Sequence, residues 1–358
     1  MAGVLKDRIS SAREYLERLG VDAILFVNLC NIRYLCGFTG SDGALLVTRE
    51  GGVFLTDSRY TTQAAQEVSR FPSREYQGKL DGIAAFIKEC DAGRVGFESE
   101  QMPVAQYNSL ADILPGVELV PLGTELTALR QVKDERELEL LARSAELASQ
   151  SLLAICNEIR PGAKERDVAL ALEFAMKQAG AEEKAFDFIV ASGIRGALPH
   201  GKASDKQIKA GELVTLDFGG IYQGYYSDET VTVAVGVPDE RQREIYGIVK
   251  EAHDLALAAV KPGVSFRELD AIARDVIAGR GYGEFFGHGL GHGVGLEVHE
   301  KPVISYRGEG NAEAGMVFTI EPGIYIPGWG GVRIEDTVAV TPDGCRCLTR
   351  IPKELMVL

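Results

Sequence analysis

The chain has 358 residues, 46% of them hydrophobic, and a formal net charge of −14 at pH 7. This length exceeds the usual size of one hydrophobic core, so we expect two domains. Because no run of Lys or Arg offsets the negative charge, we expect neither nucleic acid nor an anionic membrane surface as a partner. The sequence opens on charged residues and contains no run of about eighteen uncharged apolar residues, so we expect a cytoplasmic protein without a signal peptide or membrane span. The six cysteines show no repeated CxxC spacing, which fits a reducing compartment.

The first third of the chain predicts a compact α/β domain over 1–128. Apolar residues at helical spacing alternate with short runs of strand-forming residues between turns, as in other α/β domains. The expected helices cover 5–19, 61–68, 80–90 and 101–113. The expected strands cover 23–27, 44–48, 52–56 and 94–97.

Helical periodicity also opens the second domain, which we predict over 129–358. A long helix begins near Asp134 and continues beyond Leu153, with charged residues three and four positions apart and apolar residues on one stripe. Further helices are expected at 164–178, 240–260 and 265–278. Two similar blocks, each a helix pair followed by a hairpin, hint at an internal duplication. The whole chain is therefore assigned to the α/β (α+β) class.

Two aspartates of the second domain lie on strands that a Gly-rich turn separates. Alternation along the strand 213–218 places Asp217 on the less apolar face, and Asp228 has the same setting on the strand that follows. A hairpin closing at the midpoint, Tyr222 and Gln223, would bring both carboxylates opposite each other. Opposed like charges destabilise a sheet unless a shared proton or a divalent cation neutralises them, and a cation is the simpler explanation.

A second pair of acids repeats this geometry. Glu321 and Glu335 are centred on Gly328, and each borders a strand rich in Val, Ile and Thr. Arg333 shares a strand face with Glu335, so it is placed to orient a carboxylate or a substrate anion. A metal-free acid/base pair of the glycosidase type is the alternative, but it needs only two carboxylates. Four paired carboxylates therefore favour a metal site.

Three of the five histidines, His288, His292 and His299, fall within the Gly-rich segment 287–300. A spacing of four suits one face of a helix, but each glycine costs a helix about 1 kcal/mol relative to alanine. We therefore expect an extended, closely packed segment, in which one imidazole joins the carboxylates as a metal ligand. Spacing alone leaves the role of His200 open.

Five segments carry a combined signature: 216–220 (LDFGG), 227–230 (SDET), 287–300 (GHGLGHGVGLEVHE), 319–323 (TIEPG) and 333–336 (RIED). Together they resemble the proline-specific branch of the M24 metallopeptidases, which includes the Xaa-Pro dipeptidases (prolidases) and the Xaa-Pro aminopeptidases. The resemblance extends over the whole chain, because 33–42 and 54–60 are similar to the N-terminal part of compact family members. It implies a creatinase-like N-terminal α/β domain followed by a pita-bread catalytic domain.

By this resemblance two divalent metal ions are held by Asp217, Asp228, His292, Glu321 and Glu335. Oxygen-rich sites with one imidazole favour Mn²⁺ or Co²⁺, with Zn²⁺ or Fe²⁺ as alternatives. The implied activity is hydrolysis of the peptide bond before proline, with water activated by the ions. The expected substrates are proline-containing dipeptides or short peptides, and dipeptidase and aminopeptidase preference both stay open.

The resemblance also implies roles around the ions. Glu321 is the expected proton shuttle, and His299 is expected to stabilise the tetrahedral intermediate. His200 and His288 would help to bind or protonate the scissile region. Phe186 matches the wall of the family's proline pocket, where recognition depends on shape because proline has no N–H, although a core phenylalanine is the alternative.

Family resemblance further suggests a homodimer in which the loop 37–43, with Asp42, approaches the partner's active site. Creatinase-like C–N hydrolases and non-catalytic binding modules share this two-domain layout. The former do not use a dinuclear centre and the latter usually depart from the ligand set, so both are alternatives that the complete ligand set disfavours. Methionine aminopeptidases are similar in the second domain alone.

Overall fold

The computed structural model describes residues 8–123 and 125–358, which fall into two compact units. The units divide between Arg130 and Gln131, two residues after the expected boundary, because the 3-10 helix η1 (Thr127–Arg130) packs against α1 (Arg8–Leu19) of the first unit. The first three positions of the helix predicted over 5–19 lie outside the described residues.

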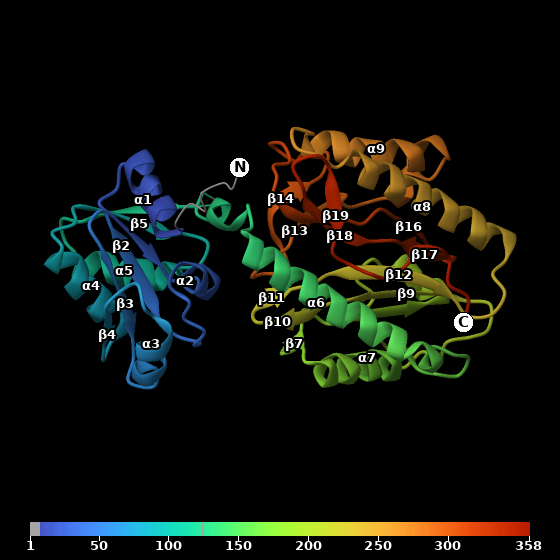
Figure 1. Cartoon of the computed structure of the whole chain (residues 1–358), viewed down its shortest axis with the longest axis horizontal. Helices are drawn as coiled ribbons and strands as arrows, with labels where there is room; N and C mark the ends of the chain where they lie inside the picture. Colours follow the sequence, from blue (N-terminus) through green and yellow to red (C-terminus); the bar gives the residue numbers. More distant parts are fainter. Residues whose placement is uncertain (1–7, 124) are drawn as a thin grey trace. The chain divides into compact units, whose positions relative to one another are not determined.

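The N-terminal unit is an α/β domain built on one six-stranded sheet (Figure 1, blue to cyan). The strand order is β4-β3-β2-β1-β5-β6, with β1, β2 and β3 antiparallel and the other pairs parallel. The strands are β1 (Ala23–Phe26), β2 (Ala44–Thr48), β3 (Gly52–Thr56), β4 (Ser73–Glu75), β5 (Arg94–Glu98) and β6 (Glu118–Leu122). The helices besides α1 are α2 (Leu29–Cys36), α3 (Thr61–Glu67), α4 (Lys79–Glu89) and α5 (Val104–Ile113).

Periodicity did not predict α2, β4, β6 or the 3-10 helix η1 of this domain. Helix α2 begins after Asn28, whose side chain accepts hydrogen bonds from the backbone N–H groups of Cys30 and Asn31, and it ends at Gly37 with φ of 86°. An Asn N-cap and a left-handed Gly are ordinary signals of helix ends, so the sequence contained enough information to predict this helix. Strand β4 is three exposed residues long, and its pairing with β3 alone defines it.

The second unit combines two helix pairs with several small sheets. Helix α6 packs with α7, and α8 packs with α9. The helices are α6 (Glu135–Ala154), η2 (Cys156–Glu158), α7 (Glu165–Ala179), η3 (Gly193–Ala197), α8 (Glu240–Ala259), α9 (Phe266–Gly279) and η4 (Gly283–Phe285). The strands are β7 (Glu183–Lys184), β8 (Ile189–Ser192), β9 (Leu213–Phe218), β10 (Gly220–Tyr222), β11 (Tyr225–Tyr226), β12 (Glu229–Ala234), β13 (Gly291–Gly293), β14 (Glu300–Ile304), β15 (Val317–Ile320), β16 (Gly323–Ile326), β17 (Gly330–Arg333), β18 (Asp336–Val340) and β19 (Cys345–Cys347). Among the described residues, none of the helices combines the length and apolar character that crossing a membrane requires.

Two blocks of the second unit share one topology. In the first block β9 lies between β8 and β12, and in the second block β15 lies between β13 and β18, with antiparallel pairing throughout. In each block a short inner hairpin, β10–β11 or β16–β17, forms between the two long strands. This shared order supports the internal duplication that the sequence indicated.

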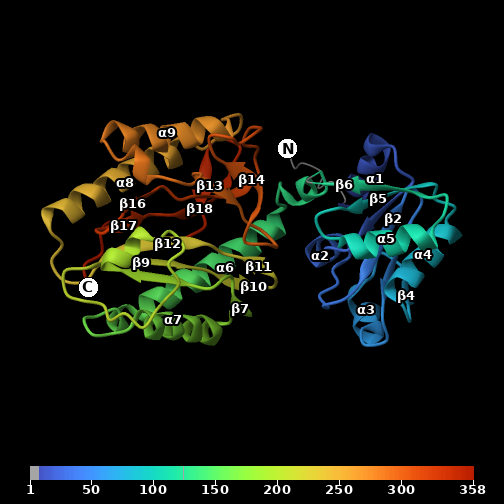
Figure 2. The ribbon, with the colours of Figure 1, turned by 180° about the vertical axis from the view of Figure 1, so that it is seen from behind.

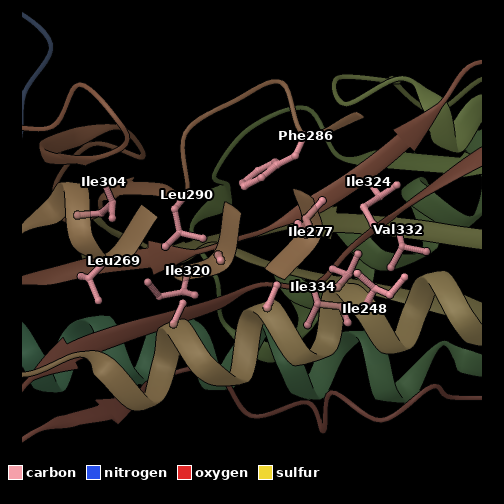
Figure 3. Packing of buried hydrophobic residues seen from close by; sticks show 14 of the residues in the cluster. Ile248, Leu269, Ile277, Phe286, Leu290, Ile304, Ile320, Ile324, Val332 and Ile334 are labelled. Carbon is pink, nitrogen blue, oxygen red and sulfur yellow. The ribbon is translucent and has the colours of Figure 1, made fainter. Parts of the chain in front are cut away.

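Each helix pair covers its sheet with an apolar face. Leu172 of α7 belongs to the same buried cluster as Leu216 of β9. Leu269 of α9 belongs to a second cluster with Ile320 and Ile334, and Figure 3 shows Leu269 near Ile320 and Ile334 near Ile248 of α8. In both views of the ribbon the strands lie between α7 on one side and α8 with α9 on the other (Figures 1 and 2). Full burial of such a side chain stabilises the fold by about 1.5–3 kcal/mol, so both faces of the strands are held firmly.

Candidate metal centre

The first carboxylate hairpin forms with a register that differs from the predicted one. Strand β9 pairs with β12 so that Asp217 faces Thr230, and Asp228 precedes β12 as a diagonal neighbour. The prediction of directly opposed aspartates is therefore wrong. The turn lies one residue later than expected, at Gln223 and Gly224, whose φ values of 46° and 75° are those of a type I′ turn. Moving the turn by one residue shifts the pairing by two, so both carboxylates still share one face.

The second carboxylate hairpin has the predicted register. The pairs run from Ile320 with Asp336, in the ladder of β15 and β18, to the inner hairpin of β16 and β17, which closes around Gly328. Glu321 and Glu335 lie at facing positions between these two ladders. The prediction that this hairpin pairs its two glutamates is confirmed.

Side-chain and backbone hydrogen bonds hold the two hairpins together. Thr230 donates from Oγ1 to Oε2 of Glu335 at 2.6 Å, and its carbonyl accepts from the N–H of Glu335 at 3.1 Å. Thr337 donates from Oγ1 to the carbonyl of Asp228 at 2.7 Å. Residues about a hundred positions apart are thereby fixed within one site.

His292 enters this site on β13, within the extended segment that the glycines predicted. A Cβ atom on Gly291 would lie 1.9 Å from the carbonyl oxygen of Thr319, so only glycine permits this close approach of two strands. The Nδ1 atom of His292 lies 3.1 Å from the Gly293 carbonyl, which places the proton on Nδ1 and leaves Nε2 unprotonated, as a metal ligand has to be. Nε2 lies 3.6 Å from Oδ2 of Asp228.

The ionisable groups of the site lie close together. Asp228, His292 and Glu335 each offer a ligand atom, and these atoms lie within 4.8 Å of one another. Burial, reinforced by repulsion from neighbouring carboxylates, raises the pKa of Asp228 and Glu335 well above their ordinary values. Burial also raises the pKa of Glu321 and lowers that of His292, which favours the neutral imidazole that a metal requires.

These residues fit divalent metal ions. Oδ1 of Asp217 is buried and has no hydrogen-bond partner among the described residues, while Oδ2 accepts from Nη2 of Arg333 at 2.5 Å. An unsatisfied buried carboxylate oxygen is costly, and a cation beside it removes that cost together with the repulsion. Four carboxylates and one neutral imidazole suit two hard or borderline divalent ions. The metal-free glycosidase-type pair leaves half of this arrangement without a role.

A cavity of about 710 Å³ opens over the centre. Its lining includes the ten residues that the sequence singled out as site residues: Phe186, His200, Asp217, Asp228, His288, His292, His299, Glu321, Arg333 and Glu335. The ring of His299 lies 4.2 Å from that of His292, centroid to centroid. Phe186 is half-buried on the cavity wall, whereas Phe188 beside it is buried in the core.

Arg333 and Tyr325 form a polar chain under the cavity. Arg333 donates to Asp217 and, from Nη1, to the hydroxyl of Tyr325 at 2.9 Å, so its guanidinium group contacts a carboxylate of the site directly. Burial raises the pKa of Tyr325 to about 12, and its neutral hydroxyl lies 2.9 Å from Nε2 of His288. Sequence reasoning missed Tyr325, although the hairpin register around Gly328 places it on the strand face of Arg333.

The raised pKa of Glu335 predicts how stability depends on pH in the metal-free protein. The folded protein binds this proton more tightly than the unfolded chain, whose pKa is near the ordinary value of 4.5. Ionisation therefore costs stability progressively as the pH rises from that value through the folded-state pKa. Without divalent ions, Glu335→Gln should melt above the parent at pH 8, by about 2–4 °C for each kcal/mol of repulsion removed, and the difference should shrink towards pH 4.

With saturating Mn²⁺ the order should reverse, because glutamine replaces a carboxylate ligand and bound ions then stabilise the parent more. Differential scanning fluorimetry with chelator and with Mn²⁺, at both pH values, measures both effects. The exposed Glu354, which lies 3.6 Å from Lys250, supplies the control substitution Glu354→Gln. If Glu335→Gln melted below the parent under every condition, Glu335 would stabilise the fold independently of metal.

The chain is similar to known proteins over nearly its whole length. Residues 139–342 match the metallopeptidase family M24, and residues 8–132 match the Creatinase/Prolidase N-terminal domain. The chain is 41% identical to a Xaa-Pro dipeptidase of Pyrococcus horikoshii over 99% of both chains. A solved Xaa-Pro dipeptidase from Bacillus anthracis superposes with a TM-score of 0.96 at 42% identity, covering 98% of this chain and 99% of that one. An X-Pro aminopeptidase from Thermotoga maritima has a TM-score of 0.89 at 40% identity, covering 96% of this chain and 100% of that one. The expected two-domain resemblance is confirmed, and the chain belongs to the metallopeptidase family M24.

Proposed function

We propose that this metallopeptidase hydrolyses the peptide bond before proline, as a Xaa-Pro dipeptidase or a Xaa-Pro aminopeptidase. The observation that carries the proposal is the convergence of four carboxylates and His292 beneath one cavity. Relatives similar over nearly the whole chain bear the names of both activities. A creatinase-like C–N hydrolase and a non-catalytic binding module are less favoured, because all four carboxylates of the ligand set are present and line the cavity.

The proposed ligands of two divalent ions are Asp217, Asp228, His292, Glu321 and Glu335. We favour Mn²⁺ or Co²⁺, with Zn²⁺ or Fe²⁺ as alternatives, because oxygen donors dominate the set. Two such ions would polarise the carbonyl group before proline and lower the pKa of the attacking water.

The remaining side chains would bind the substrate and move protons. Glu321 accepts a hydrogen bond from Thr319 at 3.2 Å, and its raised pKa suits a group that takes up and returns a proton. Burial lowers the pKa of His299, so its neutral ring can donate to developing negative charge on the substrate. His288 is oriented by Tyr325, and His200 lines the same cavity; both would contact the scissile region.

Recognition of proline would come from the cavity wall. Proline offers no N–H, so shape and apolar contact must distinguish it from other residues. Phe186 contributes a half-buried ring to this wall, together with the apolar side chains of Ile189, Val298 and Val303. Such a lining around a few converging polar groups is typical of small-molecule sites.

We also propose that the enzyme is a cytoplasmic homodimer in which the loop around Asp42 approaches the partner's cavity. Within its own domain, Asp42 accepts hydrogen bonds from Tyr76 at 2.8 Å and Lys79 at 2.7 Å. These bonds hold the loop in one conformation, as is needed if the loop is to contribute to the partner's active site. Sedimentation velocity should give a dimer, and a monomer at working concentration would contradict the proposal.

The proposed activity is tested with three peptides: Ala-Pro, Ala-Pro-Ala and Ala-Ala-Ala. We expect cleavage before proline only, lost on chelation and restored by Mn²⁺ or Co²⁺. Cleavage of Ala-Pro alone would indicate a dipeptidase, and cleavage of Ala-Pro-Ala an aminopeptidase. If none of the peptides were cleaved by protein carrying two ions, the proposal would fail in favour of a binding module.

Two neighbouring histidines should separate metal binding from catalysis. His299→Ala should lower kcat for Ala-Pro by about 10²–10³-fold, the usual effect of removing one donor to a developing oxyanion, and should keep the metal content of the parent. His292→Ala, which changes the neighbouring ring, should lose metal and activity together. Metal content is measured by elemental analysis after gel filtration. A fully active His299→Ala would refute the assigned role.

A further inference from the structure

The two carboxylate hairpins share a short sequence pattern that metal binding alone does not explain. Asp228 is followed by an acid, Thr and Val, and Glu335 is followed by the same kinds of residue. The first acid of each run lines the cavity. The second acid, Glu229 or Asp336, lies outside the cavity lining and is buried, with 0% and 6% of its surface exposed. Neighbouring residues on a strand point to opposite faces, so each ligand has a buried acid behind it.

One lysine connects these two acids. Nζ of Lys353 lies 2.6 Å from Oε1 of Glu229 and 3.2 Å from Oδ1 of Asp336. The C-terminal segment that carries Lys353 is itself fixed, because the hydroxyl of Tyr246 donates to the Lys353 carbonyl at 2.9 Å and Val357 pairs with Ala234 of β12. The ammonium group therefore bridges β12 and β18 from a rigid support.

Other donors complete the setting of each acid. Glu229 accepts from Oγ of Ser149 at 2.6 Å and from the N–H of Ile351 at 3.1 Å. Asp336 accepts from the hydroxyl of Thr349 and lies 3.2 Å from Nε2 of His253. Glu229 accepts hydrogen bonds from three groups and Asp336 from Thr349, so each of the two buried acids is held by fixed donors beside the shared cation.

The charge on Lys353 follows from its surroundings. Burial alone would lower the pKa of its amine, but attraction to Glu229 and Asp336 outweighs this and raises the pKa above its ordinary value. Lys353 is therefore an ammonium at neutral pH. Without it, the two acids would repel each other behind the centre, as the ligands repel each other within it.

We propose that Lys353 is a positioning residue of the metal centre: by holding Glu229 and Asp336 on one ammonium group, it sets the spacing between β12 and β18, the strands that directly follow Asp228 and Glu335. The covalent neighbours of the two ligands are the groups that Lys353 binds, so a displacement behind the sheet moves the ligands directly. The inference rests on the proposed two-ion site, but it concerns metal binding and not the choice of peptide.

The test removes the bridge together with one of its two acids, and Asp336 keeps the hydroxyl of Thr349 as a hydrogen-bond donor. Lys353→Met alone would leave Glu229 as an unpaired buried charge, which destabilises the fold. Lys353→Met combined with Glu229→Gln removes both charges of this pair, a change that buried pairs often tolerate. The matched control combines Lys206→Met with Glu212→Gln, a pair 2.6 Å apart in the same domain with no metal ligand as its neighbour in sequence. Circular dichroism and gel filtration verify the fold of both double variants.

The probe is Mn²⁺ alone, titrated by calorimetry into metal-free protein and followed by electron paramagnetic resonance. We expect the Lys353 double variant to bind Mn²⁺ about 10–100-fold more weakly, the usual effect of losing a partner behind a ligand. The exchange-coupled signal of a Mn²⁺ pair should give way to that of isolated ions, because the spacing is no longer held. The control should match the parent in both measurements.

A folded Lys353 double variant with parental Mn²⁺ affinity and an unchanged coupled signal would overturn the inference. An equal loss in the control would overturn it as well, since another ion pair of the same domain would then have the same effect. If the parent bound Mn²⁺ but cleaved no Xaa-Pro peptide, the proposed function would fail while these titrations still decided the role of Lys353.

Discussion

Repulsion among buried carboxylates is the constraint on which the rest of the second domain depends. Asp228 and Glu335 are brought together from different hairpins, and burial with mutual repulsion raises the pKa of both. A fold without a use for this arrangement would avoid it, because each unpaired buried charge is expensive. Here the surrounding groups stabilise the clustered acids. Thr230 connects the two hairpins by its hydrogen bond to Glu335, and the guanidinium group of Arg333 offsets the charge of Asp217.

The architecture meets this constraint by placing the acids and His292 within strands or directly beside a strand end. Each of the two blocks of like topology contributes one hairpin with two acids, and each hairpin is covered by its own helix pair. Ladder hydrogen bonds and two apolar cores hold the backbone around these acids in place. A site preorganised in this way loses little conformational entropy on binding metal, which favours tight and geometrically selective binding.

The burial that raises the pKa of the acids also lowers the pKa of three histidines. Desolvation lowers the pKa of His288, His292 and His299, so these rings are neutral at physiological pH. A neutral ring has one donor and one acceptor nitrogen, and neighbours decide which is which. The Gly293 carbonyl makes this assignment for His292, while the hydroxyl of Tyr325 and the Gly289 carbonyl make it for His288. The cavity therefore combines anionic ligands with neutral donors, a pairing suited to polarising an amide.

The sequence by itself determined most of the long helices, the two-domain order, the hairpin around Gly328 and the face of each acid, because side-chain periodicity and turn residues act over a few positions. It misplaced the first hairpin by one residue, since the choice between neighbouring turns depends on backbone angles at Gln223 and Gly224 that match the twist of the paired strands. Only the tertiary structure decided how the two hairpins meet and what stands behind them. Lys353 reaches Glu229 across 124 positions, and no local pattern records a contact between residues so far apart, because packing of the whole domain brings them together.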